Sequence, residues 1–248
     1  MIKTEEILIK GSRAAGRTRG EIFTYEPENI EESALGNLYV VAEIQSEKDS
    51  CSQLVNLLSS LIKREYYSLP HRGPTASLEA GLKKANQTLS EMSAQGNLEW
   101  LGKLHFICAV LNKEKELFLT QTGQAKAFVC REGNLTDITK KIIPPPQKPH
   151  PAKTFQSVIS GQIEATDKIF FLTPGFFNFV NEAGIEQILT LPKIEAVSEQ
   201  IKKILREQKK LPSLYALFLE ICPEKNCQEN LSQREFVTPP IGLEEIFR

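Results

Sequence analysis

The sequence predicts an α+β fold in which two stacked antiparallel β-sheets are flanked by pairs of helices. Two long helical segments follow three strand-like segments near the N-terminus. After Lys103, three strand-like segments are separated by short polar turns, as in an antiparallel meander. Two further helical segments precede a last apolar strand. With so many antiparallel strands, two sheets packed face to face and covered by helices is the economical arrangement.

The N-terminal third is expected to hold three strands and two helices. β-branched, aromatic and apolar residues favour strands at three places, 6–10, 21–25 and 38–42. Leucine and isoleucine then recur at helical spacing over 52–68, after the N-cap types Asp49 and Ser50. A second helix over 75–95 carries its apolar residues along one face.

Further strands and two further helices are expected in the rest of the chain. Strands are expected at 104–111, 116–120, 125–130, 135–138, 155–160, 168–173 and 214–221, and helices at 182–189 and 195–208. The proline-rich segment Pro144–Pro151 is expected to run as an exposed polyproline-like loop, because proline lacks the amide hydrogen that a sheet needs. We expect one domain over 1–222 and a polar tail over 223–248.

Composition narrows the class of protein. Of 248 residues, 41% are hydrophobic and 25% charged, which is typical of a soluble globular protein. The net charge of −1 predicts neither a nucleic-acid partner nor an anionic membrane partner. No apolar stretch reaches the roughly 18 residues that a bilayer span needs. Five scattered cysteines favour reduced thiols, so we expect a cytoplasmic protein.

Two local sequence patterns are candidates for a functional site, and neither has the residues that its chemistry needs. Gly11–Thr18 matches the spacing of a phosphate-binding loop, but Arg17 stands where lysine is needed and the β-rich 21–25 follows where a helix is needed. The three histidines, His71, His105 and His150, have no metal-like or triad-like neighbours in sequence. Neither pattern predicts an active site.

Six short runs occur in an order that matches one family. They are Val41–Ile44, Ala85–Asn86, Leu117–Phe128, Gly133–Thr139, Asp167–Phe176 and Leu211–Tyr215. These runs resemble the signature segments of the metal-dependent protein serine/threonine phosphatases of the PPM class, also called type 2C. The resemblance covers Lys3 to Ile221 and implies the two-sheet fold expected above.

The resemblance also implies where metal ligands should stand. In the family, aspartate oxygens hold two Mg or Mn ions, which activate a bridging water for attack on a phosphate monoester. The corresponding positions here are Glu43, Ile44, Gln124, Pro174 and Pro212. Glutamine is neutral, proline offers no side-chain ligand, and one carboxylate does not balance two dications. We therefore expect a degenerate site with no metal and no catalytic residue.

These observations favour a pseudophosphatase, a type 2C-like fold with a regulatory or protein-interaction role. Its partner is unknown, with a phosphoprotein or a kinase as candidates. The alternative is a divergent Mg- or Mn-dependent phosphatase that combines Glu43 with Asp137 or Asp167. The family's phosphate-binding arginine matches Arg13 most closely, and Arg13 and Arg17, together with Arg19, offer a possible phosphate or nucleotide site.

Overall fold

The structure is a computed structural model, and it describes residues 1–11, 18–45, 50–142, 149–178, 180–208 and 213–223. The sequence segments 12–17, 46–49, 143–148, 209–212 and 224–248, together with residue 179, lie outside this description. They include Arg13, Arg17 and Pro212 among the expected site residues. They also include most of the proline-rich segment and of the expected tail.

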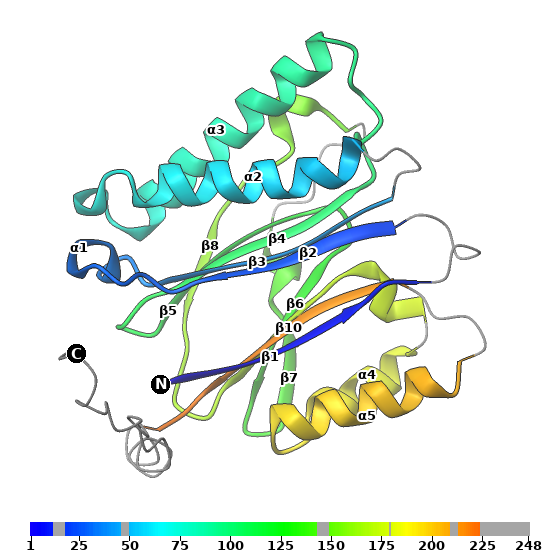
Figure 1. Ribbon diagram of the computed structural model, residues 1–248. Coiled ribbons are helices and arrows are strands. Elements are labelled where there is room, and N and C mark those ends of the chain that lie inside the picture. The colour runs from blue at the N-terminus through cyan, green and yellow to red at the C-terminus, as the bar shows by residue number, and fades with distance from the viewer. Residues whose placement is uncertain (12–17, 46–49, 143–148, 179, 209–212, 224–248) are drawn as a thin grey trace, which may run out of the picture.

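The ten strands of the described residues form two antiparallel sheets of five strands each (Figure 1). One sheet has the order β1 (Ile2–Ile9), β10 (Leu214–Ile221), β9 (Lys168–Leu172), β6 (Lys126–Arg131), β7 (Asn134–Asp137). The other has the order β2 (Thr18–Tyr25), β3 (Asn37–Gln45), β4 (Leu104–Leu111), β5 (Glu116–Thr122), β8 (Ile159–Gln162). The expected stack of two antiparallel sheets is confirmed.

Two helices cover the outer face of each sheet (Figure 1). The long helices α2 (Ser50–Tyr67) and α3 (Pro74–Ala94) lie over the β2–β8 sheet, and α4 (Glu182–Leu189) and α5 (Ile194–Arg206) lie over the β1–β7 sheet. Shorter helical segments are α1 (Ile30–Ser33), η2 (Pro70–Arg72), η3 (Ile138–Lys141), η4 (Pro151–Lys153) and η5 (Pro174–Asn178). No helix among the described residues combines the length and the apolar character that crossing a membrane requires.

Strand periodicity explains the three apolar layers of the core. Because successive side chains of a strand point to opposite faces, β3 sends Val40 and Ala42 towards α2 and α3, and Tyr39 and Val41 towards the other sheet. A third layer lies between the β1–β7 sheet and the α4–α5 pair, where α5 buries Ile201 among other residues. The apolar strand segments 38–42, 104–111, 169–172 and 214–218 are all buried in these layers.

Two expectations about loops need correction. The strand expected at 155–160 is wrong over its first four residues, because β8 begins only at Ile159. Phe155 instead has both backbone groups bound by the side chain of Asn86 on α3, with N···O distances of 2.7 and 3.0 Å. The polyproline-like loop expected over 144–151 ends differently as well, since Pro151 begins the single turn η4.

Candidate functional site

Glu43 lies near the end of β3, on the face that points towards the second sheet. Its strand neighbours in register are Gly20 on β2 and His105 on β4. Glu43 is 1% exposed and His105 is 6% exposed. The structure therefore places a carboxyl and an imidazole side by side in the layer between the sheets, where residues on one face of paired strands are close neighbours.

Hydrogen bonds from the other sheet reach the Glu43 carboxyl. The Thr173 hydroxyl and the Gly175 backbone N–H donate to it, whereas Oε2 has no partner among the described residues. Burial raises the pKa of Glu43 to about 7, and these two hydrogen bonds offset part of that rise. The carboxyl thus favours its neutral form far more than an exposed glutamate does.

Close backbone approach keeps this cluster compact. A Cβ at Gly175 would lie 1.9 Å from the carbonyl oxygen of Ser213, so only glycine fits there. Tyr215 on β10 is buried against Gly20, whose N–H donates to the phenol oxygen. The Thr173 hydroxyl oxygen accepts from the Tyr215 backbone N–H at 3.3 Å. Glu43 is therefore tied to β9 and β10 through Thr173.

Gln124 and Pro174, two of the expected family positions, line one cavity together. The Gln124 backbone N–H donates to His105 Nδ1 at 3.0 Å, and Pro174 stands between the two residues that bond Glu43. Burial lowers the pKa of His105, so the ring accepts this bond in its neutral form. The cavity therefore adjoins the Glu43 cluster.

The remaining expected site residues either lie away from the Glu43 cluster or belong to segments that the structure does not describe. The Ile44 side chain points to the opposite face of β3 and is fully buried under the helices. Arg13, Arg17 and Pro212 belong to segments that the structure does not describe. The described residues that flank those segments do meet, because Ser213 Oγ accepts from Gly11 N–H at 3.1 Å and donates to the Thr18 carbonyl at 3.3 Å.

The two aspartates considered for a divergent phosphatase do not join Glu43. Asp167 precedes β9 while Thr173, the partner of Glu43, follows it, a separation of about 20 Å along the strand. The Asp167 carboxylate is bound by Arg131 at 2.7 Å and by the Glu164 N–H at 2.8 Å. Asp137 lines the cavity but is engaged by Thr139 and lies 3.9 Å from the ammonium of Lys126.

A two-metal centre does not fit the described residues of this cluster. Mg and Mn prefer several oxygen ligands with negative charge. Glu43 is the one carboxyl of the cluster, and one of its oxygens is taken by protein donors. In the described part of the chain, no group of three or more His, Cys, Asp or Glu side chains is arranged to hold a metal ion.

Sequence reasoning missed the roles of His105, Thr173 and Tyr215. The sequence neighbours of His105 predict no chemistry, because its partner Glu43 lies across a strand pair. The sequence contains part of the information needed to find this pair, since aligning β3 antiparallel to β4 places Glu43 opposite His105. Thr173 and Tyr215 depend on how the two sheets stack, which no local pattern encodes.

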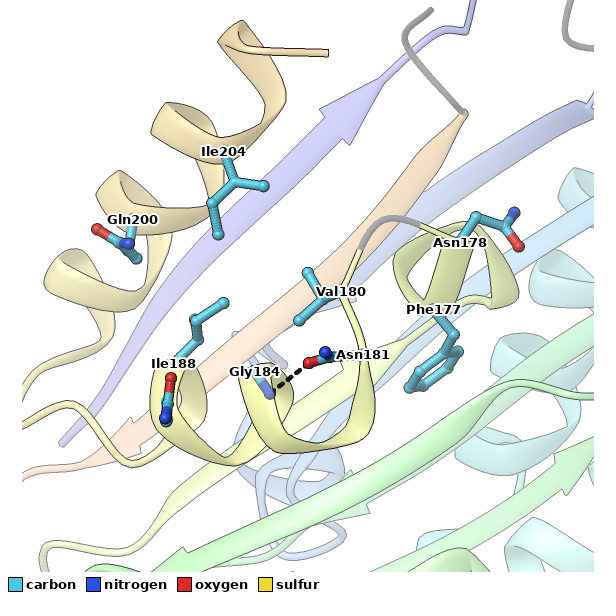
Figure 2. A pocket seen from close by; sticks show the side chains of 9 residues that line it. Phe177, Asn178, Val180, Asn181, Gly184, Ile188, Gln200 and Ile204 are labelled. Atoms are coloured by element: carbon cyan, nitrogen blue, oxygen red, sulfur yellow. Dashed lines mark hydrogen bonds between the residues drawn. The ribbon is translucent and has the colours of Figure 1, made fainter.

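Beside the cluster, two adjoining cavities form one groove around η5 and the start of α4. The first has a volume of about 550 Å³ and the second about 1130 Å³, and both are lined by Phe177, Asn178, Val180 and Asn181. Figure 2 shows the first cavity, with Ile204 of α5 facing Val180 and Ile188 across it. Asn181 begins α4 by accepting the Gly184 N–H at 2.8 Å. We call the two cavities together the η5 groove.

Comparison with solved structures identifies the fold. The chain is similar to the serine/threonine phosphatase PstP/Ppp of Mycobacterium tuberculosis, with 16% identity, a TM-score of 0.61, and coverage of 90% of this chain and 99% of that one. It is also similar to the serine/threonine phosphatase of S. agalactiae, with 11% identity, a TM-score of 0.65, and coverage of 89% and 100%. RsbX in complex with magnesium gives 13% identity, a TM-score of 0.61, and coverage of 89% and 95%.

These comparisons establish the fold of the chain. The two sheets and their helix pairs form the fold of PPM-type, or type 2C, serine/threonine phosphatases, as the sequence resemblance implied. A structure of the PstP catalytic domain contains two manganese ions. No protein-family model matches the chain, and no curated protein matches it by sequence.

Proposed function

We propose that this protein is a pseudophosphatase, a type 2C-like fold that acts through protein interaction and not through phosphate hydrolysis. The observation that carries the proposal is the state of Glu43, whose carboxyl is held by Thr173 and Gly175 instead of standing among other carboxylates. A bridging hydroxide needs cations, and cations need a negatively charged ligand set. With Pro174 and Gln124 at two further family positions, that set is not available among the described residues.

The proposal extends to the setting in which the protein works. It is a metal-free regulatory protein of the cytoplasm whose partner is another protein, with a phosphoprotein or a kinase as candidates. Reduced cysteines support this setting, because the described Cys108 and Cys130 are free thiols. The net charge of −1 supports a protein partner over a nucleic acid.

Hydrolysis in the presence of metal tests the proposal. We expect purified protein with millimolar Mn or Mg to hydrolyse p-nitrophenyl phosphate and a phosphoserine peptide no faster than buffer. The PstP catalytic domain serves as the active reference under the same conditions. Metal-dependent turnover that Glu43→Gln abolishes would establish the divergent phosphatase and end the pseudophosphatase proposal.

A further inference from the structure

The η5 groove is an unassigned cavity on the surface of the fold. Its two parts are continuous, because Phe177, Asn178, Val180 and Asn181 line both. Volumes of about 550 and 1130 Å³ are comparable with those of ligand sites in proteins. Because the second part adjoins Gln124 and Pro174, the groove opens next to the degenerate site.

Charge in the groove does not favour a phosphate group. Two lysines and two acids line the second cavity, Lys126, Lys140, Asp137 and Glu186, and their formal charges cancel. The Lys126 ammonium is shared between Asp137, at 3.9 Å, and the Phe177 ring, at 5.2 Å. None of the described residues that line the groove is an arginine, the side chain whose fork matches phosphate oxygens.

The described residues that line the first cavity carry uncharged side chains of two kinds. Its apolar walls come from Phe177, Val180, Ile188 and Ile204, which surround the space drawn in Figure 2. Its rim carries the amides Asn178, Gln187 and Gln200, all exposed. The exposed Gln124 continues this rim along the second cavity.

These features match the chemistry of an extended peptide. A side-chain amide both donates and accepts hydrogen bonds, as a peptide backbone does. Apolar walls accept one side chain and set specificity, while amides on the rim hold the backbone. The formal charges of the described lining residues cancel, so no surplus positive charge compensates the desolvation of a phosphate dianion, and a neutral segment is favoured.

We propose that the η5 groove binds an extended, unphosphorylated segment of a partner protein, with one apolar side chain seated between Phe177 and Ile204. This inference rests on the proposed function, since it names the ligand class of the interaction role. It also narrows the partner: recognition is of a neutral apolar segment and not of a phosphorylated one.

Selection from a random library of 12-residue peptides displayed on phage tests the inference. We expect enrichment of peptides that carry a leucine, isoleucine or phenylalanine flanked by uncharged residues. The double variant Gln124→Ala/Asn178→Ala should weaken the enriched synthetic peptide at least about tenfold by calorimetry, since it removes amide hydrogen bonds and leaves the core intact. The matched control Gln53→Ala/Gln95→Ala removes two exposed amides from the opposite helix layer and should bind as the unmodified protein does.

Each outcome decides the inference. Failure to enrich any peptide, or equal affinity of both double variants, overturns it. Tighter binding of the same peptide with phosphoserine in place of serine overturns it as well, because the groove would then recognise phosphate. Hydrolysis of that phosphopeptide would overturn the proposed function itself, whereas an inert protein that binds no peptide would overturn this inference alone.

Discussion

At the scale of single residues, the buried Glu43 carboxyl couples stability to pH. Its pKa is raised from 4.5 to about 7 in the folded protein, so the folded state binds this proton more tightly than the unfolded state does. The resulting stabilisation is complete below pH 4.5 and is lost as the pH rises through 7, with a total of roughly 3 kcal/mol. Glu43→Gln should therefore gain about that much relative to the unmodified protein between pH 4.5 and pH 8.

Urea denaturation at intervals across this range measures the effect. Subtracting the unfolding free energies of the two proteins at each pH separates the contribution of Glu43 from that of His105. The lowered pKa of His105 acts in the opposite direction, because it destabilises the fold as the pH falls. Glu21→Gln, at an exposed position of β2, is the control and should follow the unmodified profile. Parallel profiles for Glu43→Gln and the unmodified protein would show that the carboxyl does not titrate as described.

At the scale of elements, Asn86 joins α3 to the segment that leads into β8. Its amide bonds the N–H and the carbonyl of Phe155, and the Phe155 ring packs edge-on against Phe106 with 5.3 Å between centroids. Asn86→Ala should lower the free energy of unfolding by about 2–4 kcal/mol, because two backbone groups beside a buried ring lose their partners. Chemical denaturation measures the loss, and hydrogen exchange at the Phe155 amide locates it.

The neighbouring exposed residue Gln87 supplies the control for this element. Gln87→Ala removes an amide of similar size whose partner is Glu91 on the same helix, so a change within about 0.5 kcal/mol is expected. If the two alanine variants are equally stable, Asn86 is not what fixes the Phe155 segment.

At the scale of the whole molecule, metal binding is measurable as stability. A ligand that binds the folded state alone raises the melting temperature by mass action. Since the described part of the fold offers no cluster of metal-ligating side chains, we expect Mn or Mg at millimolar concentration to shift the Tm by less than about 1 °C. Differential scanning calorimetry tests this, with the PstP catalytic domain as a reference that binds manganese. A saturable rise of several degrees would contradict the proposed loss of the metal site.

The sequence by itself determined the elements and their layers. Apolar patterns are a local property of the sequence, so a continuous apolar run identified strands such as Leu104–Leu111, and helical spacing identified the helices whose apolar faces cover the sheets. The strand prediction failed at 155–158, because a side chain from α3 holds the backbone of Phe155 and β8 begins only at Ile159. Local propensity does not contain that long-range bond.

The tertiary structure alone decided the surroundings of the candidate site. The sequence singled out Glu43, Gln124 and Pro174 through the family resemblance, and the fold brings all three to one region. It also adds His105, which lies on β4, and Thr173, which directly follows β9. Which donors reach a buried carboxyl depends on strand register and on the stacking of two sheets, and both are set by packing between segments far apart in the chain.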